Sequence, residues 1–294
     1  MIFFYQLFSN WYSRYNERTC SYYTNDMQKQ GGRRLSGKDH QKEQPVVSII
    51  TIVYNGGKLL EGTIQSIVKQ DSARIEYIVI DGGSKDETLD LIRKYDDQID
   101  YWISEPDKGI YDAMNKGLKA ATGEYVWFMN AGDQVHGEHV LEAIFSKDKE
   151  ADVYYGETNL VNENRKVLGT RSERSTRQLP DALTYHDMLY GMVVCHQSFI
   201  ARRSLVGPYD TNYRCSADID WVIEVLKKST KIVNTQCILS DYLVGGFSIQ
   251  QQKLAWKERF QIYNHHFGIV KNSWATIYIV FRQLIHRLRG KGNY

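Results

Sequence analysis

The sequence predicts a doubly wound α/β fold, in which a mainly parallel sheet with flanking helices is followed by a C-terminal helical extension. The chain has 294 residues, 42% of them hydrophobic, and only 4 prolines, which is enough apolar material for a large core. Four apolar, strand-like segments between residues 46 and 129 alternate with helical segments. The residues that follow these strands are polar and rich in glycine, as expected at the ligand-binding edge of such a sheet.

The overall composition argues against several classes of protein. The formal net charge is +2, so the chain lacks the strongly basic character of a nucleic-acid-binding protein. The cysteines form no paired motif, which argues against a zinc site or a disulfide framework and is typical of reduced cytosolic thiols. They are Cys20, Cys195, Cys215 and Cys237. The N-terminal run MIFFYQLF is short and has no basic leader or cleavage site, so neither a signal peptide nor a transmembrane helix is predicted. The expected location is the cytoplasm.

The first 44 residues are predicted to be a poorly ordered leader. The stretch from Cys20 to Gln44 is polar, with few residues that could enter a core. Met27 could serve as an alternative initiator. Regular structure is expected to begin at Pro45.

The first half of the folded region should alternate strands and helices. A strand buried on both faces of a parallel sheet is expected at Val46–Val53, which is β-branched and almost entirely apolar. After the second strand, Ser84 and Glu87 have the spacing of a capping box that would start the next helix. The other expected elements are the helix Leu59–Val68, the strands Glu76–Ile80 and Tyr101–Ile103, the helix Ile110–Ala121 and the strand Tyr125–Met129.

Beyond about Ala151 the pattern changes. This change divides the predicted domain, 45–248, into halves over 45–150 and 151–248. The elements expected in the second half are a hairpin of Val153–Val161 and Arg165–Thr170, a strand Val193–Ile200, a helix Ser216–Lys228 and an extended segment Ile232–Val244.

The C-terminal extension, 249–294, contains a strongly amphipathic segment, Ser273–Arg289. Its apolar residues share one helical face, and they are Trp274, Ile277, Tyr278, Phe281, Leu284, Ile285 and Leu288. Its basic residues are Arg282, Arg287, Arg289 and Lys291. The apolar face could pack against the domain or a partner subunit. Alternatively, it could lie in the interface of an anionic membrane, with the enzyme peripheral to the inner face of the cytoplasmic membrane.

Polar side chains follow each of the four strands of the first half. They are Tyr54 and Asn55, then Asp81, then residues 105–108, then Asp133. Ligands of doubly wound sheets bind outside the carboxyl ends of the strands. These residues therefore predict the site.

Two of these strand ends carry carboxylates suited to a nucleotide. Asp81 is followed by Gly82 and Gly83, so it can accept hydrogen bonds from a base or ribose that approaches closely; alternatively, it satisfies amides of its own turn. Asp133 ends the segment Asn130–Asp133. A divalent cation that bridges a pyrophosphate needs only one or two protein carboxylates, and an ordinary turn is the alternative.

Two further carboxylates, Asp218 and Asp220, open the helix expected at Ser216–Lys228. Acidic residues are common in a first helical turn because they interact favourably with the helix dipole. Alternatively, one of them is a general base that deprotonates an acceptor hydroxyl.

Together these motifs resemble the family-2 glycosyltransferases. They are YNG at 54–56, DGGS at 81–84, DKGIYDAMNKG at 107–117, NAGD at 130–133 and SADIDW at 216–221. The resemblance covers roughly Val46–Val225 and looks closest to the bacterial branch that makes colanic-acid-like and capsular polysaccharides. It implies a GT-A fold, a nucleotide-sugar donor, Mg or Mn as cofactor, and inversion at the anomeric carbon. The halves of the domain would then bind the nucleotide and the acceptor.

The resemblance also implies roles for single residues. Tyr54, with Asn55 beside it, would flank the base, and Asp81 would contact uracil or ribose, which favours a UDP-sugar donor. Asp133 matches the metal-binding end of a DxD-type motif. Asp218 matches the aspartate of an acidic pair and would be the catalytic base.

The chain departs from the family pattern at several positions. Asn130 and Gly132 replace the first and middle carboxylates of the metal motif, so the metal would be held more weakly or through water. Met114 stands where an arginine is common, and Lys108 could supply the missing donor contact. Ala217 replaces the glutamate of the acidic pair.

Residues elsewhere are candidates for the acceptor side and for closure of the site. His196, Gln197 and Asp220 could face the acceptor; a structural histidine is the alternative for His196. The segment 245–248 could form a loop over the donor or a linker turn.

The expected reaction is a direct displacement. Asp218 takes the proton of the acceptor hydroxyl, the oxygen attacks the anomeric carbon, and a metal held by Asp133 neutralises the departing diphosphate. The expected acceptor is a carbohydrate or a lipid-linked oligosaccharide, and no nucleic acid is expected. A nucleotidyltransferase and a non-catalytic, membrane-attached assembly protein remain alternatives. A dinucleotide dehydrogenase is disfavoured because no GxGxxG follows the first strand.

Overall fold

The computed structural model describes residues 29–37, 45–70, 74–147, 150–245 and 251–288. The first half contains β2 (Val47–Val53), α2 (Gly57–Val68), β3 (Ile75–Asp81), α3 (Thr88–Lys94), β4 (Tyr101–Ser104), α4 (Ile110–Ala120) and β5 (Tyr125–Phe128). The part that follows contains β6 (Gln134–Val135), α5 (Val140–Lys147), β7 (Val153–Val161), β8 (Val167–Thr170), α6 (Arg171–Arg174), η1 (Tyr185–Tyr190), η2 (His196–Ser198), β9 (Phe199–Arg202), η3 (Arg203–Leu205), α7 (Ala217–Lys228) and β10 (Ile232–Leu243).

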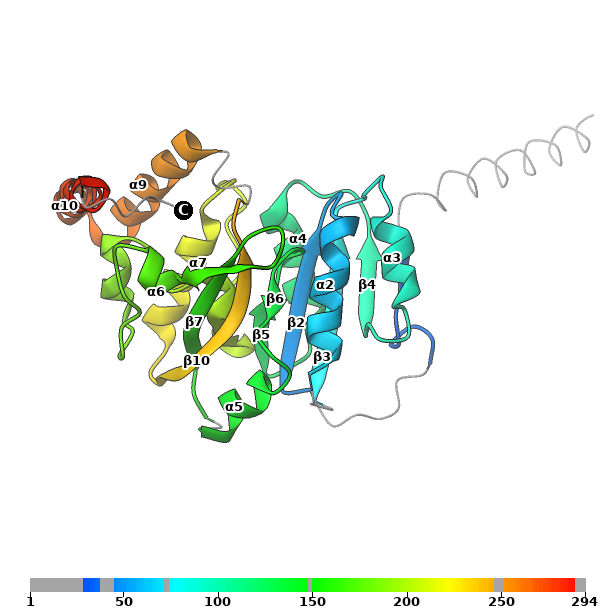
Figure 1. Ribbon diagram of the computed structural model, residues 1–294. Helices are drawn as coiled ribbons and strands as arrows, with labels where there is room; N and C mark the ends of the chain where they lie inside the picture. The colour runs from blue at the N-terminus through cyan, green and yellow to red at the C-terminus, as the bar shows by residue number, and fades with distance from the viewer. Residues whose placement is uncertain (1–28, 38–44, 71–73, 148–149, 246–250, 289–294) are drawn as a thin grey trace, which may run out of the picture.

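One sheet runs through the molecule (Figure 1). Its strand order is β1-β4-β3-β2-β5-β9-β7-β10-β6, with β8 paired to β7. The central strands β4, β3, β2 and β5 are mutually parallel, and β10 is parallel to β7. The chain first builds outward from β2 to β3 and β4, then returns to place β5 on the other side. The predicted doubly wound, mainly parallel sheet is confirmed, and the order reverses at β2, where such sheets bind ligands.

Helices cover both faces of the sheet. On one face, α4 packs on Ile50 and Ile80, and α7 packs through Trp221 on Phe128 and Phe199. On the other, α2 packs on β2, α3 packs on β3, and α5 packs through Phe145 on Tyr125 and Tyr154. All seven residues of β2 are buried, as predicted for a strand covered on both faces.

The predicted capping box at Ser84 and Glu87 is wrong. Helix α3 begins at Thr88, and Glu87 precedes it without a side-chain cap. The Ser84 hydroxyl and backbone amide instead donate to the carboxylate of Asp81. In a capping box the Ser84 oxygen would accept from the Glu87 amide, but it accepts from the Asn55 amide at 2.7 Å instead. Ser84 therefore belongs to the strand-end turn and not to the helix.

The strand predicted at Val193–Ile200 is observed, but it is shorter and begins later in the chain. Residues 196–198 form the 3-10 turn η2, and the strand β9 occupies Phe199–Arg202. The Trp127 indole donates to the carbonyl of Gln197 at 2.8 Å, and the Ser198 amide donates to Cys195. These contacts bend the backbone before it can pair as a strand. The hairpin of β7 and β8 is confirmed.

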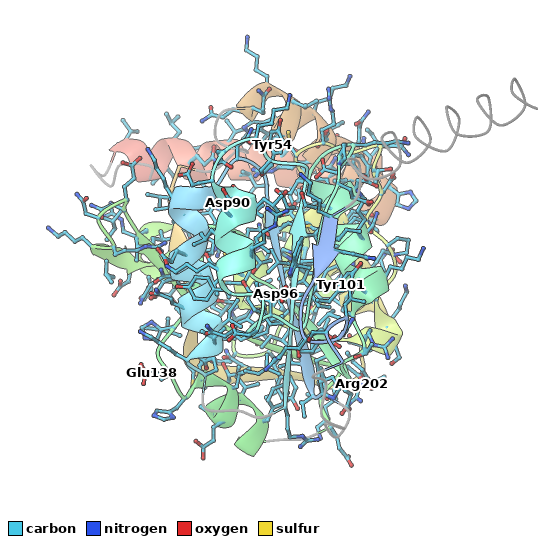
Figure 2. The ribbon with its side chains drawn as sticks, turned by 90° about the vertical axis from the view of Figure 1, so that its right-hand side faces the viewer. Tyr54, Asp90, Asp96, Tyr101, Glu138 and Arg202 are labelled. Atoms are coloured by element: carbon cyan, nitrogen blue, oxygen red, sulfur yellow. The ribbon has the colours of Figure 1, made fainter. Side chains whose placement is uncertain are left out.

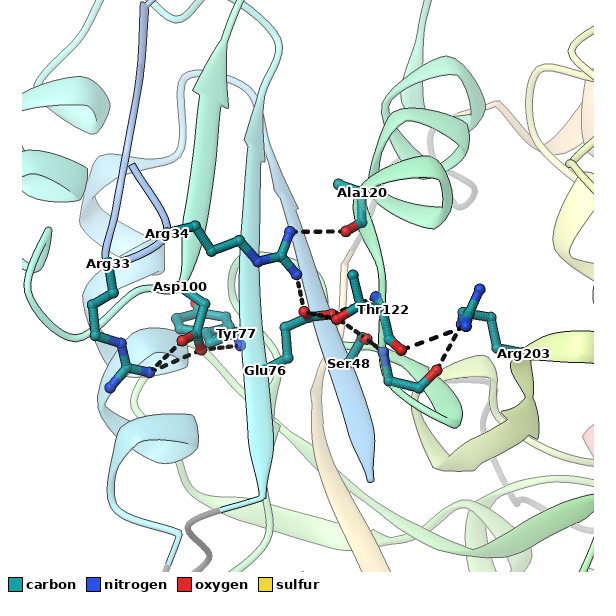
Figure 3. Close-up of polar contacts among 10 residues, drawn as sticks. Arg33, Arg34, Ser48, Glu76, Tyr77, Asp100, Ala120, Thr122 and Arg203 are labelled. Atoms are coloured by element: carbon teal, nitrogen blue, oxygen red, sulfur yellow. Dashed lines mark hydrogen bonds and ion pairs between the residues drawn. The ribbon is translucent and has the colours of Figure 1, made fainter. Parts of the chain in front are cut away.

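Regular structure begins before Pro45, because residues 29–37 of the expected leader are ordered. Strand β1 (Lys29–Gly31) pairs antiparallel with β4 and closes that edge of the sheet. The turn that follows places Arg34 on the buried carboxylate of Glu76 and Arg33 on Asp100 (Figure 3). The rest of the leader, 1–28 and 38–44, lies outside the described residues.

The C-terminal extension is helical, with α9 (Gln252–Phe267) and α10 (Ile269–Leu288). Figure 1 shows both at the opposite end of the molecule from α3 and β4. On α10, Ala275 and Ile279 are buried, whereas Ile285 is only partly covered. The exposed apolar side chains are Ile269, Val270, Trp274, Ile277, Tyr278, Val280, Phe281, Leu284 and Leu288. In the described part of the chain, no helix combines the length and apolarity needed to cross a membrane.

Candidate active site

The predicted nucleotide-side residues gather where the parallel strands end. Figure 2 shows Tyr54 at one end of the molecule, with Glu138 and Arg202 toward the other. The Tyr54 ring is 63% exposed and therefore free to stack on a ligand. Asn55 has a left-handed backbone, with φ at 48°, and its side-chain oxygen accepts from the Lys85 amide at 2.9 Å. Asn55 thus ties the end of β2 to the loop after β3.

Asp81 is fully buried at the end of β3. Its carboxylate accepts from the backbone amide of Ser84 and, at 2.6 Å, from the hydroxyl of Ser104 at the end of β4. Of the alternatives for Asp81, the turn contacts are therefore real. They hold the carboxylate in one orientation directly beneath the loop that carries Gly82.

A second acidic residue lies beside this loop. A Cβ on Gly82 would come within 2.4 Å of the Asp107 carboxylate and 3.3 Å of the Tyr54 ring. Burial raises the pKa of the Asp107 carboxyl, and the Gly109 amide opposes this by donating to it. Asp107 was visible in the sequence only as part of the 105–108 junction; its closeness to Tyr54 comes from the fold.

Lys108 makes no side-chain contact with the described residues that supports or contradicts its predicted role. Its side chain is exposed and makes no hydrogen bond or ion pair with any residue that the structure describes. The neighbouring Lys116 is the one that pairs with Glu105, at 2.8 Å. The donor contact predicted for Lys108 stays a prediction.

Asp133 is buried and held from two sides. One carboxylate oxygen accepts from the side chain of Gln197 at 2.9 Å, and the other accepts from the backbone amide of Leu243 at 2.9 Å. The Thr63 hydroxyl fixes the backbone by donating to the Asp133 carbonyl at 2.7 Å. Burial raises the pKa of this carboxyl to about 7, and the bonds from Leu243 and Gln197 work against that rise.

The surroundings of Asp133 fit a hard cation that takes most of its ligands from a bound nucleotide. The side-chain oxygen of Asn130 is buried and meets no hydrogen-bond partner in the described structure. Gly132, with φ at 103°, leaves the turn open; a Cβ there would lie 3.2 Å from Leu243. Among the described residues, no cluster of three or more His, Cys, Asp or Glu could hold a metal alone. One carboxylate and one amide oxygen suit Mg or Mn shared with phosphate oxygens.

Arg165 is a site residue that the sequence did not indicate. It lies in the turn between β7 and β8, and its charge lowers the pKa of Asp133. One terminal nitrogen of its guanidinium is buried without a hydrogen-bond partner in the described structure. Its backbone is left-handed, with φ at 60°. A non-glycine residue in this conformation is a signal that only the structure provides.

Asp218 stands at the start of α7 next to a group of aromatic rings. Its carboxylate accepts from the Tyr111 hydroxyl at 3.1 Å, and Tyr111 stacks on Tyr209 with ring centroids 5.7 Å apart. The residue is half-buried. Burial and the charge of Asp218 hold the pKa of Tyr111 well above its usual range, so the tyrosine stays a hydrogen-bond donor.

Asp220 points to a different neighbour. Its carboxylate bonds the ring of His266 on α9 at 2.7 Å, and Glu224 lies 3.5 Å from the same ring. The two carboxylates of the SADIDW motif therefore separate. Asp218 faces the tyrosines, and Asp220 fastens α7 to α9.

His196 and Gln197 also separate. The His196 ring is buried, stacks on Phe128 at 5.3 Å and bonds the Tyr209 hydroxyl at 3.0 Å. Burial lowers the pKa of His196 to about 4, so the ring is neutral. These contacts favour the structural alternative for His196, whereas Gln197 reaches Asp133. Within the predicted loop 245–248, only Gly245 lies inside the described residues.

Comparison with known proteins identifies the class of enzyme. The family model "Glycosyl transferase family 2" matches residues 48–207. An uncharacterized glycosyltransferase of Mycobacterium tuberculosis is 32% identical over 221 residues, which is 72% of this chain and 80% of the relative. The chain belongs to the family-2 glycosyltransferases.

A more distant relative is also a glycosyltransferase by name, and two solved structures share the fold. A putative teichuronic acid biosynthesis glycosyltransferase of Bacillus subtilis, TuaG, is 26% identical over 73% of this chain and 84% of its own length. Staphylococcus aureus TarS in complex with UDP-GlcNAc matches the fold with a TM-score of 0.58 at 18% identity. That match covers 74% of this chain and 64% of the TarS chain. A Pyrobaculum calidifontis mannosyltransferase in complex with GDP-Man and Mn2+ gives 0.57 at 16% identity, over 84% of this chain and 76% of its own. The predicted GT-A fold is confirmed.

Proposed function

We propose that this glycosyltransferase is a metal-dependent, inverting enzyme that moves a sugar from a nucleotide-sugar to an acceptor hydroxyl in surface polysaccharide biosynthesis. The observation that carries the proposal is the state of Asp133. A carboxylate that is buried and oriented by Gln197 and Leu243 lies next to the partnerless amide oxygen of Asn130, at the edge where the nucleotide of such folds binds. This arrangement suits a cation much better than an ordinary turn.

Asp218 is the general base of the proposal. Its contact with Tyr111 fixes the carboxylate at 3.1 Å without neutralising it, because a phenol donates a hydrogen bond but carries no charge. The free carboxylate oxygen can take the proton of the acceptor hydroxyl as that oxygen attacks the anomeric carbon. A single displacement of this kind inverts the anomeric centre.

The nucleotide is bound by the residues at the ends of β2 and β3. The exposed ring of Tyr54 flanks the base, and Asp81 and Asn55 fix the loops against which the base and ribose lie. A UDP-sugar is favoured by the family resemblance, and TarS was crystallised with UDP-GlcNAc. Lys108 and Arg165 are two cations that could contact the diphosphate. A divalent cation bound at Asp133 and Asn130 would neutralise the charge of the departing diphosphate.

The enzyme is further proposed to work at a membrane surface. Helix α10 leaves one face of large apolar side chains exposed, including Trp274, Ile277 and Phe281. An amphipathic helix of this kind can lie in a lipid interface, with its cationic residues on anionic headgroups. The name of the Bacillus relative, which concerns teichuronic acid, is in keeping with an acceptor of the cell surface.

The test is a screen of nucleotide-sugars for donor hydrolysis with Mg, Mn and EDTA. We expect metal-dependent release of the nucleoside diphosphate from at least one donor. This release should be lost in Asp133→Asn, which keeps the volume of the buried side chain and an oxygen for the Leu243 amide, with only a small change in Tm. Asp152→Asn is the matched control, because Asp152 lies at the opposite end of the sheet, where it accepts from Thr230 and Lys231. Release of pyrophosphate from a nucleoside triphosphate, or nucleotide binding without turnover of any donor, would refute the proposal.

A further inference from the structure

Four arginines gather between η1 and the two C-terminal helices. Three of them donate to carbonyl oxygens of one loop: Arg171 to Val193 at 2.6 Å, Arg177 to Gly191 at 3.0 Å, and Arg282 to Tyr190 at 3.0 Å. The fourth, Arg259, lies on α9. We call Arg171, Arg177, Arg259 and Arg282 the arginine cluster.

The cluster carries more positive charge than its surroundings neutralise. Asp187 is the carboxylate that pairs with it in the described structure, at 3.9 Å from Arg177. Burial lowers the pKa of the Arg177 guanidinium, and the charges of Arg282 and Arg171 lower it further. Burial and mutual repulsion raise the free energy of these charged guanidinium groups, and a bound anion would lower it.

Hydrogen-bond donors of the cluster are also unused. The Nε atoms of Arg259 and Arg282 are both buried and meet no hydrogen-bond partner in the described structure. Arg259 makes no hydrogen bond or ion pair with any described residue. A buried N–H of a guanidinium without a partner costs free energy, so these groups point to a ligand that would accept from them.

The loop that the cluster holds joins it to the proposed catalytic carboxylates. Residues 190–193 lead to Gln197, whose side chain donates to Asp133 at 2.9 Å, and η1 packs against α7, the helix that carries Asp218. Tyr263 on α9 is buried, and the charges of Arg259, Asp218 and Arg177 all act on its hydroxyl. Cys195, next to the turn that holds Gln197, is acted on by both Arg171 and Asp133. An anion at the cluster would therefore sit near Asp218 but beyond the nucleotide half, where an acceptor belongs.

We propose that the arginine cluster binds a phosphoryl group of the acceptor. This rests on the proposed function, because it assumes that Asp218 faces an acceptor. Planar guanidinium groups give pairs of parallel N–H donors that match phosphate oxygens, and several of them together suit a dianion. Arg282 shares α10 with the exposed apolar face, so the geometry favours a phosphoryl group carried by a lipid over a free one.

The experiment uses inorganic phosphate and phosphatidic acid as probes on the full chain. Phosphate is titrated in EDTA at constant ionic strength, and Tm is followed; vesicles of phosphatidylcholine with and without phosphatidic acid are tested by flotation. We expect phosphate to raise Tm of the wild type, and the apparent affinity to fall about tenfold in Arg259→Gln. Arg282→Lys, which keeps the charge but loses the planar fork, should weaken binding as well. A response to phosphatidic acid without one to free phosphate would assign the site to a lipid.

Lys257→Gln is the matched control, because it removes one positive charge from an exposed position on the same helix. An equal loss of phosphate response in that variant would overturn the proposal, since the effect would then be general charge. A parallel loss of UDP binding in Arg259→Gln would also overturn it, by placing the cluster at the donor. If the wild type hydrolyses a donor but shows no response to phosphate or phosphatidic acid, the acceptor inference fails while the proposed function stands. If the cluster binds phosphate but no donor is turned over, the proposed function fails instead.

Discussion

Individual side chains of this enzyme take their roles from their partners more than from their position in a motif. Asp218 and Asp220 lie two residues apart at the start of α7, yet one accepts from Tyr111 and the other is bound to His266. The adjacent His196 and Gln197 diverge in the same way, into an aromatic core and onto Asp133. Neighbours in sequence point to opposite sides of a helix or turn, so a motif provides candidates and the fold selects among them.

His196 should make stability depend on pH. Its pKa in the folded protein is about 4, below its ordinary value of 6.5, because burial disfavours the charged ring. Between these values the unfolded chain binds more protons than the folded one. The contribution is therefore complete above about pH 6.5 and is lost as the pH falls toward 4. Between about pH 7.5 and pH 5, the loss should be about 2 kcal/mol.

Denaturant unfolding at the two pH values measures this loss. Asp133, whose pKa is raised to about 7, binds a proton in the folded protein over the same range and opposes this loss in the wild type and the variant alike. The measured quantity is therefore a difference: on going from pH 7.5 to pH 5, the free energy of unfolding of His196→Gln, which cannot be protonated, should end about 2 kcal/mol higher relative to the wild type than it began. His139→Gln, at an exposed position, is the control and should behave as the wild type. Equal pH dependence in His196→Gln and the wild type would show that the buried ring is not the source.

At the scale of elements, the edge of the sheet is closed by a buried ion network. Glu76 on β3 is 4% exposed and accepts from Ser48, from Arg34 and from the backbone amide of Thr122 at 2.7 Å (Figure 3). The network joins β3, β2, the end of α4 and the turn after β1. The N-terminal turn that carries Arg34 is thereby held against the sheet.

Replacing Arg34 alone should lower the free energy of unfolding more than replacing Arg34 and Glu76 together. Arg34→Met leaves the Glu76 carboxylate buried without its cation, and we expect a loss of about 3 kcal/mol in the free energy of unfolding. Adding Glu76→Gln removes the uncompensated charge, so the double variant should recover part of that loss. Chemical denaturation of the wild type, both single variants and the double variant measures the coupling. If the changes in the free energy of unfolding of the two single variants simply add in the double variant, the proposed coupling of Arg34 and Glu76 is wrong.

The sequence predicted well the elements whose signal is local. The β-branched run of β2 and the apolar face of α10 each fall within one segment, so periodicity is enough to find them. Strand β1 was missed because Lys29–Gly31 has no apolar pattern; it is a strand only because β4 offers it an edge. The predicted capping box is wrong because the Ser84 oxygen accepts from the amide of Asn55, which is 29 residues away in sequence.

The candidate site was predictable only in part, for the same reason. Tyr54, Asp81 and Asp133 follow strands directly, and the geometry of a parallel sheet brings such residues together. The supports of Asp133 come from far along the chain: Gln197 is 64 residues away and Leu243 is 110. The arginine cluster likewise draws on α6, the segment after it, α9 and α10. Contacts between residues so far apart in sequence cannot be predicted from a local sequence pattern.

At the scale of the whole molecule, the two C-terminal helices distinguish one end of the enzyme from the other. Nine large apolar side chains are exposed along α10, whereas β1 and its turn cover the opposite edge of the sheet. A continuous apolar face of this size on one helix is typical of a surface that meets lipid or protein. One member of the arginine cluster, Arg282, lies on the same helix and donates to the carbonyl of Tyr190.

Liposome flotation tests the membrane role of α10. The full chain should bind vesicles with anionic lipid, bind them less at high salt, and bind neutral vesicles weakly. Replacing Trp274, Ile277 and Phe281 by serine should abolish binding, because these side chains are exposed and do not support the fold. Leu35→Ser, another exposed apolar position, is the control. Unchanged binding by the triple variant would contradict the membrane role.

The most direct test of the account is a comparison of Asp218→Asn with Asp220→Asn in sugar transfer. Both variants remove one carboxylate from the same helix, so they share any general effect of lost charge. We expect Asp218→Asn to bind UDP as the wild type does, and its transfer rate to fall by roughly a hundredfold or more. Asp220→Asn should keep transfer within a few-fold and lower Tm, because it loosens α7 from α9. If Asp220→Asn abolishes transfer and Asp218→Asn does not, the base has been assigned to the wrong carboxylate and the account of catalysis is wrong.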